Sequence, residues 1–122
     1  MLASGAGMDA SVALSELVEV STQVVEVVIV GPGGAVEAAR TAGDERAGAL
    51  AAHGAELLAE ASSIRADGPP VERVHVDTER GSLVAVTDGE RTAVATTVAE
   101  PTLGLVAYDL RTALARVRED NA

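Results

Sequence analysis

The chain contains no cysteine, tryptophan, phenylalanine or lysine among its 122 residues, and Tyr108 is its single tyrosine. The absence of cysteine excludes disulfides, thiol catalysis and cysteine metal sites, and it agrees with a cytoplasmic location. Without large aromatic rings, a close-packed core has to consist of small aliphatic side chains, and a second subunit can complete the buried surface. We therefore expect an aliphatic core and an oligomer.

The charge is one-sided, because 19 acidic residues against nine arginines give a net charge of -10. A phosphate backbone or an anionic membrane surface would repel most faces of such a protein, so we expect no nucleic-acid partner. No apolar run approaches the roughly 20 residues that span a bilayer, and residues 1–8 lack the basic start and apolar middle of a signal peptide. The sequence therefore predicts a soluble, cytoplasmic protein without membrane insertion.

The length fits one domain with a single hydrophobic core. We assign this domain to residues 9–118, between a flexible N-terminal tail at 1–8 and a C-terminal tail at 119–122. Asp9 and Ser11 are both suitable N-caps for a first helix that runs to about residue 21.

A hairpin is predicted directly after this helix. Residues 24–30 are β-branched throughout except for Glu26, which is typical of a central strand. The run Gly31-Pro32-Gly33-Gly34 cannot continue a strand but can reverse one, so residues 35–40 are expected to return as a shorter outer strand.

The most informative segment is a long helix that is predicted from Gly43 and Asp44 to Ile64 or Arg65, with Asp44 as its cap. At 3.6 residues per turn its side chains separate into three stripes. The stripe expected to face a sheet contains Ala47, Leu50, Ala51, Gly54, Leu57, Leu58, Ala61 and Ile64. A stripe of very small residues contains Gly48, Ala52, Ala55 and Ala59. A polar stripe contains Arg46, His53, Glu56, Glu60 and Ser63.

The small stripe has two interpretations. Small side chains at this spacing allow another helix to approach closely along the line they form. Alternatively, alanine is a good helix former in an alanine-rich protein, and the stripe is exposed by chance. We favour helix packing because a helix with only a core face needs no such stripe.

The second half of the chain predicts a three-stranded meander and a final helix. Asp67-Gly68-Pro69-Pro70 ends the long helix, and strands are expected at residues 71–78, 82–87 and 91–98 with short turns between them. After Pro101 the apolar spacing is helical for about four turns. The order α-β-β-α-β-β-β-α predicts an α+β fold in which a five-stranded antiparallel sheet lies between helices.

This order resembles the roadblock/light-chain-7 family, which includes dynein light chains and bacterial regulators of Ras-like GTPases. The resemblance covers most of the chain, from about Asp9 to Arg118, and the residues that carry it are 27–36, 55–58, 81–89 and 103–111. The turn Gly31-Pro32-Gly33-Gly34 departs from the family, where many members have an acidic residue and one glycine. The composition, rich in alanine and glycine and free of lysine, is more typical of bacteria.

The resemblance implies a homodimer in which the long helices pack antiparallel and the strand at 71–78 pairs across the axis. Carried onto this sequence, the expected dimer interface consists of Gly48, Ala52, Ala55, Ala59, Val74 and Val76. The resemblance also implies a Ras-like small GTPase as partner. The residues expected to contact it are Arg46, His53, Glu56 and Glu60.

The candidates for chemistry are weak, so we expect no enzyme, cofactor or metal. Residues 31–34 lack the Gly-Lys-Ser/Thr that ends a phosphate-binding loop, and a turn is the better interpretation. His53 and His75 have no ligand at a recognised metal spacing, although at an interface their protonation could modulate contact. The acidic residues Asp77, Glu79 and Asp88 surround turns, and the serines at 62 and 63 lack a base.

Three functions remain. The first is a homodimeric regulator or scaffold that binds a Ras-like GTPase and modulates its activity. The second is a structural homodimer without a GTPase partner. The third is a small-ligand sensor of the PAS or GAF type, which would require a pocket between sheet and helix with polar groups that point inward.

Overall fold

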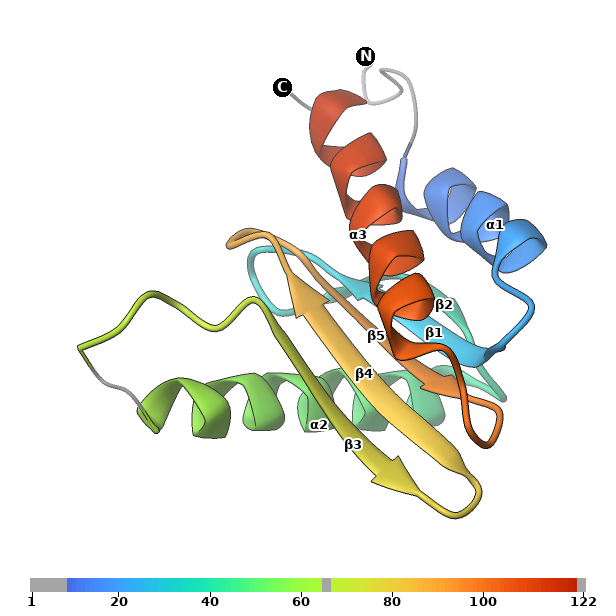
Figure 1. Cartoon of the computed structure of the whole chain (residues 1–122). Coiled ribbons are helices and arrows are strands. Elements are labelled where there is room, and N and C mark those ends of the chain that lie inside the picture. Colours follow the sequence, from blue (N-terminus) through green and yellow to red (C-terminus); the bar gives the residue numbers. More distant parts are fainter. Residues whose placement is uncertain (1–8, 65–66, 121–122) are drawn as a thin grey trace.

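A computed structural model describes residues 9–64 and 67–120 of the chain (Figure 1). The elements follow in the order α1 (Ala10–Val20), β1 (Val24–Val30), β2 (Val36–Arg40), α2 (Asp44–Ser63), β3 (Arg73–Thr78), β4 (Gly81–Thr87), β5 (Thr92–Thr97) and α3 (Leu103–Asp120). The predicted α+β fold and its element order are confirmed. The tail predicted at residues 1–8 lies outside the described residues.

The five strands form one antiparallel sheet in the order β2-β1-β5-β4-β3. Figure 1 shows α1 and α3 on one face of this sheet and α2 on the other. The predicted hairpin and meander are joined because β5 pairs with β1, which places β1 inside the sheet and leaves β2 and β3 at its two edges.

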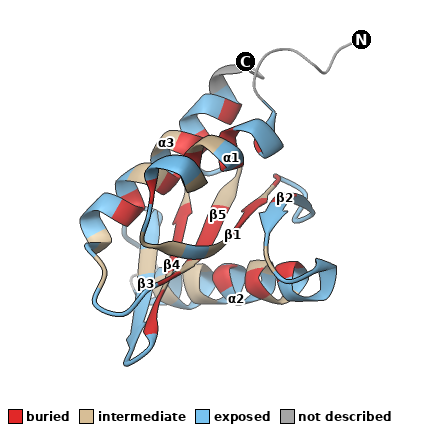
Figure 2. Cartoon of the chain, turned by 90° about the vertical axis from the view of Figure 1, so that its right-hand side faces the viewer, coloured by how far each residue is buried: buried red, intermediate tan, exposed pale blue. Residues whose placement is uncertain are grey.

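Alternating strand residues build two separate cores, one on each face of the sheet. Figure 2 shows buried residues in the sheet and in the helices on both of its faces. Val27 and Ile29 point to the larger core, which α1 and α3 cover, whereas Val28 between them points to the smaller core under α2. Both faces of β1 are therefore buried, which explains its nearly continuous β-branched sequence. All of the large fully buried side chains are aliphatic, as the sequence predicted.

The helix ends show how local residues set the boundaries. The Asp9 carboxylate accepts a hydrogen bond of 3.0 Å from the backbone N–H of Val12, so Asp9 is the predicted N-cap of α1. The prediction that Asp44 caps α2 is wrong, because Gly43 occupies the cap position and Asp44 is the first helical residue. There its carboxylate, with that of Glu45, still complements the positive end of the helix dipole.

Two further expectations differ from the structure. Ile64 was expected in the core stripe of α2, but it follows the last helical residue and its relative exposure is 80%. Figure 1 shows that the C-terminal end of α2 extends beyond β3, the edge strand of the sheet, which explains why Ile64 is not buried. At the other end of the chain, α3 continues to Asp120, two residues beyond the predicted end of the domain.

Candidate interaction surface

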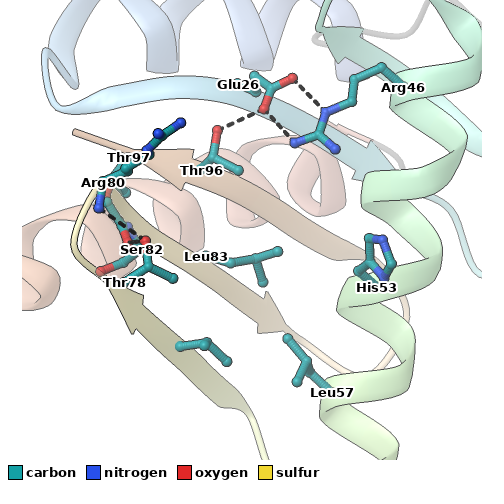
Figure 3. A pocket seen from close by; sticks show the side chains of 12 residues that line it. Glu26, Arg46, His53, Leu57, Thr78, Arg80, Ser82, Leu83, Thr96 and Thr97 are labelled. Atoms are coloured by element: carbon teal, nitrogen blue, oxygen red, sulfur yellow. Dashed lines mark hydrogen bonds and ion pairs between the residues drawn. The ribbon is translucent and has the colours of Figure 1, made fainter. Parts of the chain in front are cut away.

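A bidentate ion pair fixes the N-terminal part of α2 to the sheet (Figure 3). The Arg46 guanidinium donates two hydrogen bonds of 2.8 Å to the carboxylate of Glu26 on β1. The hydroxyl of Thr96 on β5 donates a third hydrogen bond of 3.0 Å to this carboxylate. The hydrogen bonds from Arg46, which outweigh partial burial, lower the pKa of Glu26, and the same contact raises the pKa of Arg46.

The glycine at position 54 determines how closely α2 approaches the sheet. A Cβ on Gly54 would overlap the side chain of Val94 on β5. The register of the strands places Val94 in one row with Val28, Ala85 and Val74, so this row lies under α2.

The next row of the sheet is only partly covered by α2. It contains Glu26, Thr96, Leu83 and Val76, and it forms the floor of an open groove of 520 Å³ beside the helix (Figure 3). The lining residues are Glu26, Arg46, His53, Leu57, Val76, Thr78, Arg80, Gly81, Ser82, Leu83, Thr96 and Thr97. We call this hollow the groove.

Most polar groups in the groove already have partners within the chain. The Ser82 hydroxyl donates to Asp77 at 2.7 Å, and the Thr78 hydroxyl donates to the carbonyl of Gly81 at 2.7 Å. The guanidinium of Arg80 has no partner among the described residues. Such a surface, in which Leu57, Val76 and Leu83 lie among polar groups that are mostly paired, fits apolar side chains of another protein better than a small polar ligand.

The small stripe of α2, here called the ridge, consists of Gly48, Ala52, Ala55 and Ala59, and all four are exposed. A Cβ on Gly48 would meet no atom within 4 Å, so the fold of this copy does not require glycine there. At 100° per residue, the ridge is about 150° around the helix axis from the groove-lining residues of α2. The ridge and the groove therefore lie on opposite flanks of the helix.

The predicted partner-contact residues Arg46, His53, Glu56 and Glu60 are all exposed on α2. Only Arg46 and His53 of these line the groove. His53 Nδ1 lies 3.8 Å from a carboxylate oxygen of Glu56. Glu56 points almost directly away from the sheet, because it lies about 160° from Gly54 around the helix.

The edge strand β3 is the least covered strand of the sheet. Val74 is half-buried against the core under α2, whereas Val76, in the groove, has a relative exposure of 41%. The remaining residues of β3 are exposed, and its outer edge has no strand neighbour among the described residues. Its pairing with β4 is regular over six residue pairs, whereas the pairing of β2 with β1 is interrupted by a bulge.

Among the residues that were weighed for chemistry, His75 and Asp77 lie close together, with His75 Nε2 3.8 Å from a carboxylate oxygen of Asp77, whereas Asp88 and His53 lie apart from this pair. Asp77 and Asp88 lie at opposite ends of the β4 strand, and Asp88 accepts hydrogen bonds from the backbone N–H groups of Glu90 and Arg91 in a turn. His53 lies on α2, whereas His75 pairs with Val84, whose side chain points to the opposite face of the sheet. The described residues contain no cluster of three or more potential metal ligands.

The Gly31-Pro32-Gly33-Gly34 run forms the predicted hairpin turn. The backbone N–H of Gly34 donates to the carbonyl of Gly31 at 3.0 Å, and Gly34 has a φ of 90°, which glycine adopts without strain. The turn connects two strands and precedes no helix, so it lacks the context of a phosphate-binding loop.

The groove, Arg80 and the Glu26–Arg46 contact were not predicted from the sequence. Glu26 gave one signal, since it is the single charged residue in a β-branched strand. Nothing local in the sequence shows how much of the sheet α2 leaves open, because that depends on its packing angle.

These features define the chain as an α+β sandwich with one partly uncovered sheet face. Its fold is that of Roadblock/LC7 domains: a Roadblock/LC7 domain from Streptomyces avermitilis matches it with a TM-score of 0.81, 20% identity and coverage of 92% of this chain and 97% of that chain. MglB from Myxococcus xanthus matches with a TM-score of 0.74, 14% identity and coverage of 90% and 85%. Comparison with protein-family models and with curated proteins found no match.

A similar fold also occurs in a profilin, which is neither a Roadblock/LC7 domain nor an MglB protein. Profilin IB from Acanthamoeba castellanii matches with a TM-score of 0.59, 18% identity and coverage of 86% of this chain and 93% of that chain. The fold alone therefore does not identify a partner. Within residues 9–64 and 67–120, no helix has the length and apolar character needed to cross a membrane.

Proposed function

We propose that this chain is a non-catalytic, homodimeric regulator or scaffold that binds a Ras-like small GTPase. The observation that carries the proposal is the uncovered surface of a Roadblock/LC7 fold, where the outer edge of β3, the groove and the outward face of α2 all lie on one side of the molecule. Edge strands and apolar grooves of this kind are features of protein interfaces.

Self-association is the first part of the proposal. A second copy that pairs along β3 satisfies the outward backbone groups of both edge strands and joins two five-stranded sheets into one. A solved MglB structure that shares the fold has a tetrameric arrangement, which supports assembly of copies as a property of this architecture.

The GTPase partner is the second part of the proposal. It follows from the roadblock/light-chain-7 resemblance, and the outward face of α2, with Glu56 near its centre, is the surface we assign to it. Arginines or lysines of a partner would complement the acidic residues Glu56 and Glu60. A regulator of this type needs no catalytic group of its own, because it can reorder the residues of the GTPase.

A pull-down with Ras-like GTPases from the same genome tests this function. Each GTPase is loaded with GDP or with a non-hydrolysable GTP analogue, and we expect binding that depends on the nucleotide. The Glu56→Arg variant is expected to bind at least tenfold more weakly, whereas Glu19→Arg on α1 is the matched control. Dimerisation without nucleotide-dependent binding would instead support the structural homodimer.

A thermal-shift screen against nucleotides and metabolites distinguishes a small-ligand sensor from the two protein-binding functions. A ligand that binds only the native state raises the melting temperature. We expect no shift, because most polar groups of the groove are already paired within the chain.

A further inference from the structure

The outer edge of β3 carries a charge pattern that is complementary to itself. Arg73 and Asp77 lie on the same face of the strand, two residues on either side of His75. We infer, as an extension of the self-association proposed above, that two copies pair antiparallel along β3 with His75 opposite His75 of the partner subunit. This alignment is here called the His75 register.

The backbone of β3 is arranged for this register. The backbone N–H of Thr87 on β4 donates to the carbonyl of Glu72 at 2.9 Å, so even-numbered residues direct their backbone groups toward β4. In an antiparallel sheet the odd-numbered residues then direct theirs toward the free edge. In the His75 register, the outward residues Arg73, His75 and Asp77 face outward residues of the partner subunit and can exchange hydrogen bonds with them.

The side chains favour the same register. Arg73 lies opposite Asp77 of the partner subunit, and the two-fold symmetry makes this pair twice. The Arg73 guanidinium has no partner among the described residues of its own copy. On the other face, Val74 lies opposite Val76 of the partner subunit, and cross-strand pairs of both kinds stabilise a sheet.

Neighbouring registers lose part of this complementarity. A shift by two residues in one direction places Arg73 opposite His75 of the partner subunit, so that both Arg73–Asp77 pairs are lost. A shift in the other direction places His75 opposite Asp77 of the partner subunit, but it moves Arg73 out of line with Asp77 and opposite Glu79 of the partner subunit, in the turn beyond the strand. Shifts by one residue would oppose side chains from different faces of the sheet.

The same register determines which flank of α2 faces the second copy. The helix crosses its own sheet over the row that contains Val74, whereas Val76 lies in the groove. A two-fold axis at His75 lies on the groove side of the helix, so α2 of the partner subunit approaches over the groove. The ridge is on the opposite flank and remains open in this dimer.

The end of α2 is long enough to reach the groove of the partner subunit. After Leu57 the helix continues for six residues, about 9 Å, which is close to twice the spacing of neighbouring strands. The exposed Ile64 follows these residues and provides an apolar side chain for the floor formed by Val76 and Leu83.

Charge exchange on β3 tests the register. Arg73→Asp and Asp77→Arg each place two like charges opposite each other in a homodimer, and we expect the dissociation constant of each variant to rise roughly tenfold or more. An equimolar mixture of the two variants should form a heterodimer, because each acidic position then faces an arginine. The double variant R73D/D77R should regain the wild-type dimer, and native mass spectrometry measures all three.

The matched controls are Arg111→Asp on α3 and Glu19→Arg on α1, which make the same kinds of charge change at exposed positions away from β3. We expect neither to reproduce the complementation between variants. Asp77 also accepts a hydrogen bond from Ser82, but recovery in the mixture and in the double variant does not depend on that bond. If the wild type is a dimer and neither combination recovers, the register is overturned while self-association stands. A monomeric wild type overturns both, whereas the GTPase pull-down tests partner binding separately.

Discussion

Gly54 of α2 lies directly against Val94 of β5, and a Cβ on the glycine would overlap the valine side chain. Gly48, less than two turns earlier on the same helix, faces open space. The two glycines therefore have different structural roles. Gly54 allows α2 to pack closely against the sheet, whereas Gly48 makes no close contact within its own chain.

The two glycines predict opposite effects of the same substitution. Gly54→Ala should lower the free energy of unfolding by about 1–3 kcal/mol, because the added methyl overpacks the core under α2. Gly48→Ala should raise it by about 0.5–1 kcal/mol, because alanine restricts the unfolded chain and fits the helix. Urea denaturation of both variants provides the comparison, and equal effects at the two positions would contradict the packing of α2.

The Glu26–Arg46 contact predicts a pH-dependent contribution to stability. The folded pKa of Glu26 is lowered, so the contribution is complete above the ordinary value of 4.5 and is lost as the pH falls through the lowered pKa. Arg46→Gln should therefore destabilise the protein at pH 7 and have a smaller effect at acid pH, below the lowered pKa of Glu26. Because the Arg46 side chain has a relative exposure of 43%, solvent screening limits the expected loss to about 1 kcal/mol.

Urea denaturation at several pH values measures this contribution. Arg111→Gln is the control, since Arg111 is exposed on α3 and has no ion pair among the described residues. An Arg46→Gln effect that stayed constant from pH 7 to acid pH would show that the carboxylate of Glu26 is not its origin.

The two flanks of α2 give a third prediction. Ile64→Arg should weaken the dimer at least tenfold, because the exposed isoleucine would be replaced by a charge at the partner's apolar groove. Ala55→Arg on the ridge should leave the dimer intact in the His75 register. Sedimentation equilibrium of both variants measures the difference, with Ala115→Arg on α3 as the matched control for the second substitution. The reverse outcome would place the helix contact on the ridge, as the sequence alone predicts.

Most of the fold could be predicted from the sequence because the periodicity of each segment is clear. Val27, Val28 and Ile29 alternate between the two cores, and the sequence indicates this burial on both faces by its uninterrupted β-branched residues. Glycine and proline determine the turn at residues 31–34. Strand boundaries agreed to within two residues. Ile64 was misplaced because the helical period continues up to this residue, whereas the sheet beneath it ends.

The candidate surface could be predicted only in part. Helix geometry alone places the alanines and the glycine of the ridge in one stripe. Their exposure in the single chain is expected both for an interface and for an ordinary solvent-facing surface. The groove depends on the three-dimensional relation of α2 to Leu83 and Val76, which are distant in sequence from it. The groove lies beside β3, and for this reason we propose that α2 of the partner subunit packs on the groove side of α2 and not on the ridge.

Self-association is the claim on which the register, the groove and the joint partner surface all depend. Light scattering coupled to size-exclusion chromatography measures it most directly, over a concentration range up to hundreds of micromolar and at neutral pH. We predict a particle with twice the mass of the 12.3 kDa chain. A particle with the mass of one chain at every concentration, with β3 and the groove open to water, would contradict the account.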